Sequence, residues 1–124
     1  MVTVGTDIVD VARVRDAAPT FVSRILRPDE EAYCHSTVDP PQHIAARFAA
    51  KEAVFKALQP ESPNSIAWHD IEILRADHGV PQVRLWGAAR KLADERGVTR
   101  IQVSLSHVAE FALAAAVCEW EDRA

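Results

Sequence analysis

The feature that most constrains the fold is a long alanine-rich stretch from about Pro41 to Leu58. It follows the break Asp39-Pro40-Pro41 and carries Glu and Lys at helical spacings. Ala, Glu and Lys are strong helix formers, and proline is well tolerated at a helix start. The sequence therefore predicts its longest helix over residues 41–58.

Alternating apolar residues predict strands on both sides of this helix. Residues 1–11 predict a first strand, and residues 100–106 alternate cleanly, with apolar side chains on one face and polar ones on the other. Residues 68–74 and 82–86 predict a hairpin joined around Asp77-His78-Gly79. Residues 111–120 are ambiguous, because their alanines favour a helix whereas the short gap after His107 favours a returning antiparallel strand.

Shorter helices are predicted between these strands. Residues 11–16 follow Asp10 as a plausible N-cap, residues 19–25 form a second helical stretch, and Pro28 with the acids after it indicates another start. Residues 87–96 predict a helix closed by Gly97. The expected fold class is α+β with a mostly antiparallel sheet.

Composition limits the functional classes. The 124 residues suit one compact domain over 1–124, and the formal net charge of −4 argues against nucleic acid as the main partner. No apolar run approaches the roughly 20 residues that span a bilayer, and the N-terminus is not a signal peptide. Cys34 and Cys118 match no metal or redox spacing and are expected to be reduced thiols. These features predict a cytoplasmic protein without a membrane partner.

Charged residues on the predicted long helix are the first functional candidates. Glu52 and Lys56 share a face with Phe48 and Phe55, which suggests a partly buried polar site. The alternative is an ordinary i,i+4 ion pair that contributes a few tenths of a kcal/mol. Arg47 and Lys51 are also four residues apart, and two like charges at that spacing hint at an anion between them. A solvated basic face would look the same.

Asp7 stands inside an otherwise apolar first strand. If it converges with Glu52, the two carboxylates offer a hard oxygen site that suits Mg²⁺, which takes one or two protein carboxylates and completes its shell with water and phosphate oxygens. The alternative is an acid at a turn or strand end.

The strand over residues 100–106 ends in polar side chains. Ser104 and Ser106 project to its polar face and can donate hydrogen bonds to phosphate, whereas His107 falls on the parity of the apolar face. A packed or edge histidine is therefore an alternative to a ligand-binding one.

Three segments together resemble the ordered motifs of holo-[acyl-carrier-protein] synthase, the small, single-domain group of 4′-phosphopantetheinyl transferases. They are residues 4–10 (VGTDIVD), 47–57 (RFAAKEAVFKA) and 103–107 (VSLSH). The resemblance covers almost the whole chain, including residues 70–73 and the turn 79–81, and its central motif is highly specific. It implies a mostly antiparallel sheet packed on a long central helix, and a trimer with each active site between two subunits.

The resemblance also implies an activity. A serine hydroxyl of an acyl carrier protein attacks the β-phosphorus of coenzyme A and releases adenosine 3′,5′-bisphosphate. Asp7 and Glu52 would hold Mg²⁺, Lys56 would contact the diphosphate, and Glu52, directly or through a metal-bound water, would take the serine proton. Such a step needs charge neutralisation and in-line positioning above all.

Further residues receive implied binding roles. The positions matched to binding of coenzyme A are Arg47, Lys51, Lys56, Gly79, Pro81, Ser104, Ser106 and His107. Arg13, and more weakly Arg24, match basic residues that dock the acidic recognition helix of the carrier protein. Arg13 can equally be a solvated helix residue.

The chain departs from the family pattern at two places. Val80 stands where a basic residue is usual. Residues 59–65 (QPESPNS) replace a Gly-Thr-Gly loop and contain no glycine, and Glu61 adds a negative charge. Two prolines also remove two N–H donors. We therefore expect a reshaped loop that weakens coenzyme A binding or narrows the choice of carrier protein.

Two alternatives remain open at the level of sequence. One is a catalytically silent trimeric module that docks carrier domains or binds a nucleotide, which the altered loop favours. The other is a small structural α+β trimer, which would not bind coenzyme A. The presence of Asp7, Glu52 and Lys56 favours the enzyme, since docking alone does not require them.

Overall fold

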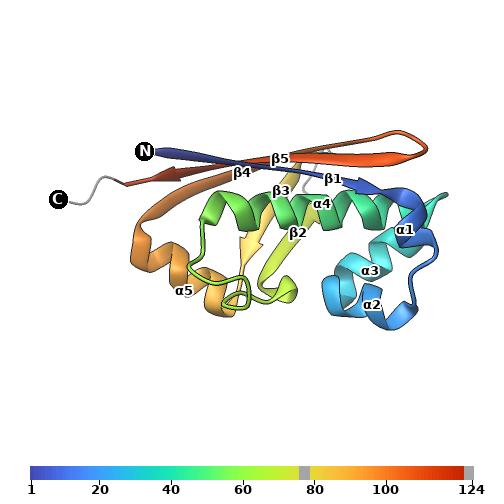
Figure 1. Ribbon diagram of the computed structural model, residues 1–124, viewed down its shortest axis with the longest axis horizontal. Helices are drawn as coiled ribbons and strands as arrows, with labels where there is room; N and C mark the ends of the chain where they lie inside the picture. The colour runs from blue at the N-terminus through green and yellow to red at the C-terminus, as the bar shows by residue number, and fades with distance from the viewer. Residues whose placement is uncertain (76–78, 122–124) are drawn as a thin grey trace.

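The computed structural model describes residues 1–75 and 79–121 and has two antiparallel sheets and five α-helices within them. In Figure 1 the strands β1, β5 and β4 lie over helix α4, with α1, α2 and α3 at one end and α5 at the other. In chain order the elements are β1 (Val2–Asp10), α1 (Val11–Arg15), α2 (Pro19–Ile25), α3 (Pro28–His35), α4 (Pro40–Leu58), the 3₁₀ turn η1 (Trp68–Asp70), β2 (Ile71–Arg75), β3 (Pro81–Leu85), α5 (Gly87–Arg96), β4 (Val98–His107) and β5 (Phe111–Trp120). The predicted α+β class with antiparallel pairing is confirmed.

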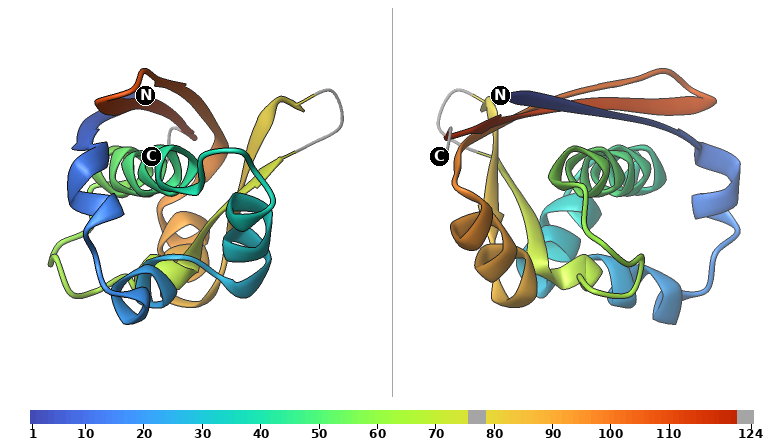
Figure 2. Two further views of the ribbon diagram at one scale, coloured as in Figure 1. Left: turned by 90° about the vertical axis from the view of Figure 1, so that its right-hand side faces the viewer. Right: turned by 60° about the vertical axis from the view of Figure 1, so that its left-hand side comes forward.

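The larger sheet has the order β1-β5-β4, and both of its pairings are antiparallel. β2 and β3 form the predicted hairpin as a separate two-stranded sheet, which rises obliquely at the side of the larger one (Figure 2). Asp77 and His78 of its expected connection lie outside the described residues. The ambiguous segment 111–120 is a strand, as the short gap after His107 favours.

The prediction of a strand from Trp68 was wrong by three residues. Residues 68–70 form a 3₁₀ turn because the carboxylate of Asp70 accepts a hydrogen bond from the backbone N–H of Ala67 at 3.1 Å. An acid that binds backbone this way competes with strand pairing. β2 therefore begins at Ile71.

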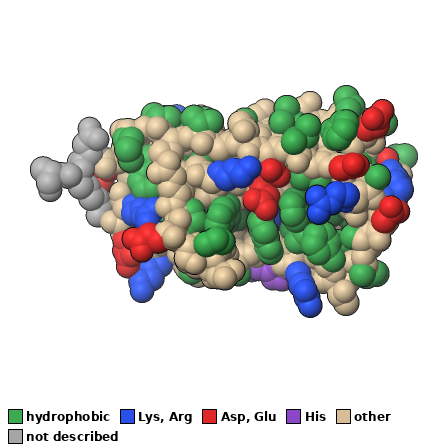
Figure 3. Space-filling view, in the orientation of Figure 1, with side chains coloured by type: hydrophobic (Ala, Val, Ile, Leu, Met, Phe, Trp, Pro, Cys, Tyr) green, Lys and Arg blue, Asp and Glu red, His purple; other side chains and the backbone are tan. Residues whose placement is uncertain are grey.

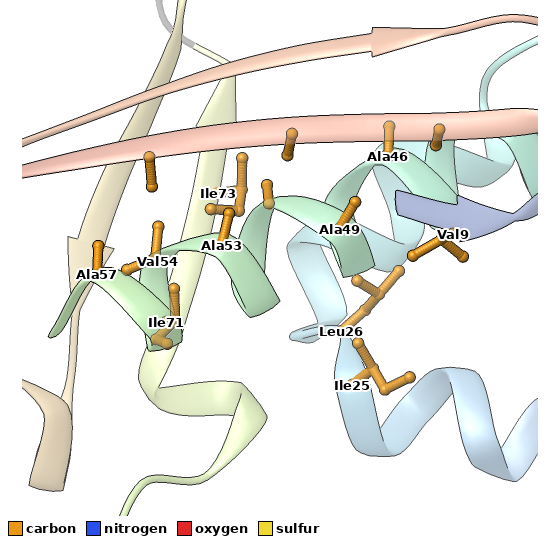
Figure 4. Close-up of a cluster of buried hydrophobic side chains, with 14 of the residues drawn as sticks. Val9, Ile25, Leu26, Ala46, Ala49, Ala53, Val54, Ala57, Ile71 and Ile73 are labelled. Carbon is orange, nitrogen blue, oxygen red and sulfur yellow. The ribbon is translucent and has the colours of Figure 1, made fainter. Parts of the chain in front are cut away.

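The core between α4 and the larger sheet is built mainly from alanines. Side chains along one face of α4 point toward the strands, among them Ala49, Ala53 and Ala57 (Figure 4). Ala112, Ala114 and Ala116 point inward from β5, and each is at most 1% exposed. Such small side chains let the helix lie close under the sheet, whereas larger side chains would hold the helix and the sheet further apart.

Gly5 marks the point where β1 comes closest to α4. A Cβ at this position would overlap the carbonyl oxygen of Ala53 and lie 2.9 Å from the backbone nitrogen of Ala57. Nearby, the Thr3 hydroxyl donates to the Ala57 carbonyl at 2.6 Å. Residues 3, 5, 7 and 9 share a strand face, so the same close approach turns Asp7 toward α4.

None of the helices in the described part of the chain combines the length and the apolar character that a membrane crossing requires.

Candidate active site

Asp7, Glu52 and Lys56 meet where β1 crosses α4. The Lys56 ammonium lies 3.2 Å from the Asp7 carboxylate and donates to the Thr6 carbonyl at 2.9 Å. Among the described residues, Glu52 and Lys56 form no ion pair within 4 Å, so the local i,i+4 pair is not what holds these side chains. The lysine instead ties the helix to the first strand, and Glu52 stays free to act on a ligand.

The surroundings of Glu52 raise the pKa of its carboxyl group and so favour its neutral form. Burial is the largest cause that raises its pKa, the charge of Asp7 raises it further, and the charge of Lys56 opposes both. Two carboxylates that disfavour each other's charge are stabilised when a cation enters between them.

This donor set fits Mg²⁺. Within the described residues no group of three or more His, Cys, Asp or Glu side chains can hold a metal. The protein therefore offers two carboxylates, Asp7 and Glu52, and leaves the remaining positions to water and phosphate oxygens, as Mg²⁺ prefers.

A cavity of about 550 Å³, here called the acidic cavity, opens beside these carboxylates. Asp7 and Glu52 line it together with Arg13 and an apolar wall that includes Phe21 and Phe48, whose ring centroids are 6.1 Å apart. In the middle of this side of the molecule, acidic and basic side chains adjoin hydrophobic ones (Figure 3). The cavity thus combines charge for a phosphate with an apolar surface.

Glu52 also reaches a neighbouring cavity of about 530 Å³, walled by the glycine-free loop. Phe55 and Trp68 line it with Pro63 and Asn64, and the two rings have centroids 6.4 Å apart. Glu61 does not line either of the cavities that contain Glu52; its side chain is 92% exposed and lies 3.9 Å from Arg96. The negative charge that Glu61 adds to the loop therefore does not enter either cavity, because its side chain turns toward Arg96 on α5.

A third cavity, of about 480 Å³ and here called the basic cavity, collects the residues expected at the nucleotide end. The candidates that line it are Arg47, Gly79, Pro81, Ser104 and His107. Ser106, although exposed, is not among the described lining residues. Sequence reasoning missed Tyr33, His43 and Arg75, which also line this cavity. His43 had a usable signal, since it stands one helical turn before Arg47.

Arg47 is held by an aromatic ring and is incompletely satisfied. It is 7% exposed, and its guanidinium lies over the Tyr33 ring, 4.3 Å from the centroid. Arg75 flanks the same ring at 5.5 Å and donates to the Tyr33 hydroxyl at 3.2 Å. The buried Nε of Arg47 has no hydrogen-bond partner among the described residues. Native structures rarely leave such a donor unpaired, so this nitrogen is available to an acceptor on a ligand.

The prediction that Lys51 binds the substrate was wrong. Its side chain is fully buried, and its ammonium lies 2.8 Å from the Glu30 carboxylate and donates to the carbonyls of Trp68 and Ile71. Burial lowers the pKa of Lys51, and the charge of Glu30 opposes that shift. A lysine has three donors, and all three are used inside the core, so Lys51 joins α4 to α3 and β2.

The two docking candidates lie apart. Arg13 on α1 is exposed at the rim of the acidic cavity. Arg24 on α2 is exposed but lines neither cavity that contains Glu52. Neither arginine forms an ion pair within the described ranges. Arg13 is therefore placed to meet a partner that reaches Glu52.

The acidic and basic cavities use different sides of α4. Glu52 and Arg47 are five residues apart, which places their side chains about 140° apart around the helix. No described residue lines both cavities. A single chain therefore presents the acid pair and the nucleotide candidates as two separate half-sites.

Comparison with known proteins gives one consistent answer. Residues 3–116 match the sequence profile of the 4′-phosphopantetheinyl transferase superfamily. The chain is 44% identical over 121 residues to holo-[acyl-carrier-protein] synthase of Clavibacter sepedonicus, covering 95% of each chain. It superposes on the crystal structure of the Neisseria meningitidis enzyme with a TM-score of 0.85 at 31% identity, covering 94% of this chain and 97% of the other. The Helicobacter pylori enzyme in complex with coenzyme A gives a TM-score of 0.81 at 31% identity, covering 94% and 99%.

Proposed function

The chain belongs to the 4′-phosphopantetheinyl transferase superfamily, and from that premise we propose how it works as a holo-[acyl-carrier-protein] synthase. It transfers the 4′-phosphopantetheine arm of coenzyme A to a serine of an apo acyl carrier protein. We propose that residues 1–124 act as one catalytic domain, that Mg²⁺ assists, and that the working form is a homotrimer.

The observation that carries the mechanism is the meeting of Asp7, Glu52 and Lys56. The serine oxygen forms a bond to the β-phosphorus, and the bond from that phosphorus to the oxygen of adenosine 3′,5′-bisphosphate breaks. Glu52, which lines the acidic cavity beside Asp7, accepts the serine proton. Lys56, fixed on Asp7 and Thr6, stabilises negative charge on the diphosphate.

Asp7 and Glu52 would hold Mg²⁺, which neutralises charge on the diphosphate when bound. The acidic cavity takes this end of coenzyme A, and the reshaped loop with Pro63 and Asn64 lies beside it. The nucleotide end belongs in the basic cavity, where Arg47 and His107 are placed to bind it.

The separation of the two half-sites supports an active site shared between subunits. One coenzyme A molecule reaches both if the acidic cavity of one subunit faces the basic cavity of the next, and head-to-tail contacts of this kind close into rings such as trimers. The outward face of β1 and β5 exposes Val2, Val4, Ile8, Phe111 and Leu113, each at least 43% exposed. A contiguous apolar surface suits burial between subunits, and Figure 3 shows hydrophobic side chains along this margin.

Arg13 is the proposed docking residue for the carrier protein, with Arg24 as a secondary contact. Both are exposed, and Arg13 borders the cavity in which the serine must meet Glu52. A local positive charge suffices to attract an acidic helix, although the protein as a whole is acidic.

The test is the intact mass of a purified apo carrier protein after incubation with this protein, coenzyme A and Mg²⁺. Transfer adds about 340 Da, the mass of one phosphopantetheine arm. Glu52→Gln should abolish the gain while circular dichroism stays unchanged, and the exposed Glu110→Gln serves as the matched control. Full turnover by Glu52→Gln would remove Glu52 from the mechanism.

The rival function is a catalytically silent docking module, which the glycine-free loop favours. Binding of coenzyme A without any mass gain across several carrier proteins would support that module against the enzyme. Sedimentation of the same sample tests the trimer, and a monomer with full activity would refute the shared active site.

A further inference from the structure

The basic cavity gathers two arginines and two histidines without a described acid. Four of its lining side chains are Arg47, Arg75, His43 and His107, and no described lining residue is an Asp or Glu. The protein as a whole has a formal net charge of −4. Cations gathered without acids are stabilised by an anion, and the unpartnered Nε of Arg47 is one donor that an anion would satisfy.

His43 is a titratable member of this set with no role in the proposed function. It lies half-buried in the first turns of α4, with its ring centroid 5.3 Å from that of His107 and 6.0 Å from that of Tyr33. The two imidazoles therefore lie side by side, between the strand β4 and the arginines that flank Tyr33. Any anion held by Arg47 and His107 comes within reach of His43.

Burial and the basic groups around His43 together lower the pKa of its imidazole. Burial is the largest cause that lowers its pKa, followed by His107 and Arg47, and Arg75 on β2 acts in the same direction. Asp39, at the start of its own helix, opposes them, and α3 contributes only the neutral ring of Tyr33. The set facing His43 is thus mostly cationic.

We propose that His43 is an additional, proton-switched cation of the basic cavity, which binds the phosphomonoester on the nucleotide end of coenzyme A with uptake of a proton. This inference rests on the proposed function, because it takes coenzyme A as the ligand. It adds a residue and a pH dependence that the transfer chemistry at Glu52 does not require.

The sign of the pH dependence follows from linkage. A bound phosphate dianion favours charged His43 and raises its pKa above the value in the free protein. Binding is therefore tightest at low pH and weakens as the pH rises through the raised pKa of the complex. A phosphomonoester has its second pKa near 6, so the ligand stays mainly dianionic between pH 6.5 and 8.5.

The experiment compares coenzyme A with 3′-dephospho-coenzyme A, both in Mg²⁺, by titration calorimetry at pH 6.5 and 8.5. We expect the affinity ratio of the two ligands to be about tenfold larger at pH 6.5, as one charge-assisted hydrogen bond allows. His43→Phe keeps the aromatic contacts, and His43→Gln is a second variant in case the first fails to fold. Both should reduce the pH dependence of the ratio, since His107 is then the one imidazole left among the described lining residues. His35→Gln, on the exposed end of α3, is the control and should retain it.

The outcomes separate this inference from the function on which it rests. A ratio that is independent of pH in the wild type, or unchanged in both His43 variants, would overturn the role of His43 even if the carrier protein gains its arm. The expected ratios without any transfer would support His43 and refute the enzyme. If neither ligand binds at either pH, both proposals fail.

Discussion

Replacing Lys51 by Met tests whether this lysine is a core residue or a substrate ligand. Methionine nearly preserves the length of the side chain but removes the ammonium that lies 2.8 Å from Glu30. The Glu30 carboxylate would keep only two backbone donors, the N–H groups of Arg27 at 2.8 Å and Ile73 at 2.9 Å. The Ile71 carbonyl would lose the Lys51 donor as well, whereas the Trp68 carbonyl would keep the backbone N–H of Ile71.

The size of the effect follows from the fate of that carboxylate. Removing one partner of a buried ion pair usually costs about 3–5 kcal/mol, because the other charge stays buried. The variant can avoid this by binding a proton, and protonating an ordinary glutamate of pKa about 4.3 costs about 3.7 kcal/mol at pH 7 but only about 1 kcal/mol at pH 5. The Ile71 carbonyl without its donor adds about 1 kcal/mol.

We therefore expect Lys51→Met to lower the free energy of unfolding by about 4–5 kcal/mol at pH 7 and by about 2 kcal/mol at pH 5. The loss grows with pH because the folded variant then holds a proton that the unfolded chain releases. Urea unfolding at pH 5, 6 and 7 measures it, at one fixed protomer concentration because assembly shifts apparent stability. Lys51→Met/Glu30→Gln should recover part of the loss at pH 7.

Two results would refute this reasoning. A loss below about 1 kcal/mol at pH 7, or an equal loss at pH 5 and pH 7, would show that the Glu30 charge does not depend on Lys51. A second measurement separates the two roles directly. At pH 5, where more of the variant is folded, its affinity for coenzyme A should stay within about twofold of the wild type, because Lys51 donates only to core acceptors.

Two further substitutions test the route from fold to function. Gly5→Ala should lower the free energy of unfolding by about 1–3 kcal/mol and reduce transfer, because the added Cβ pushes β1, and with it Asp7, away from α4. Thr6→Ala, on the exposed face of β1, is the control and should change neither quantity in the same urea and mass assays. Arg13→Ala should weaken carrier-protein binding about threefold to tenfold and reduce the salt dependence of that binding, while coenzyme A affinity is unchanged. A parallel fall in both affinities, or the same effect from the control Arg90→Ala on α5, would mean that Arg13 has no docking role.

Most of the elements could be predicted from local patterns, and the exceptions have physical causes. The strand β5 is rich in helix-forming alanines, because the close approach of α4 requires small side chains there. Tertiary packing therefore decided the structure of this segment against its propensity. Residues 68–70 form a turn in place of the predicted strand because the Asp70 carboxylate accepts a hydrogen bond from the N–H of Ala67. That bond depends on one rotamer and leaves no periodic signal in the sequence.

The candidate site could be predicted only in part. Asp7, Glu52 and Lys56 were selected together, and the structure brings them together. Lys51 was assigned wrongly, because its partner Glu30 stands 21 residues earlier on another helix and nothing in the local spacing indicates that pair. His43 shares a helix face with Arg47, which the spacing indicates, but its position beside His107 depends on β4 lying next to α4, which a single sequence does not reveal.

The two half-sites on opposite sides of α4 have a consequence for the genetics of this enzyme. In the proposed trimer, two inactive alleles, one changed at Glu52 and the other at His107, would damage different halves of each shared site. When both are expressed together in a trimer, about a quarter of the interfaces would join an intact acidic half to an intact basic half. Two recessive mutations in the same gene would then restore each other, as if they lay in separate genes.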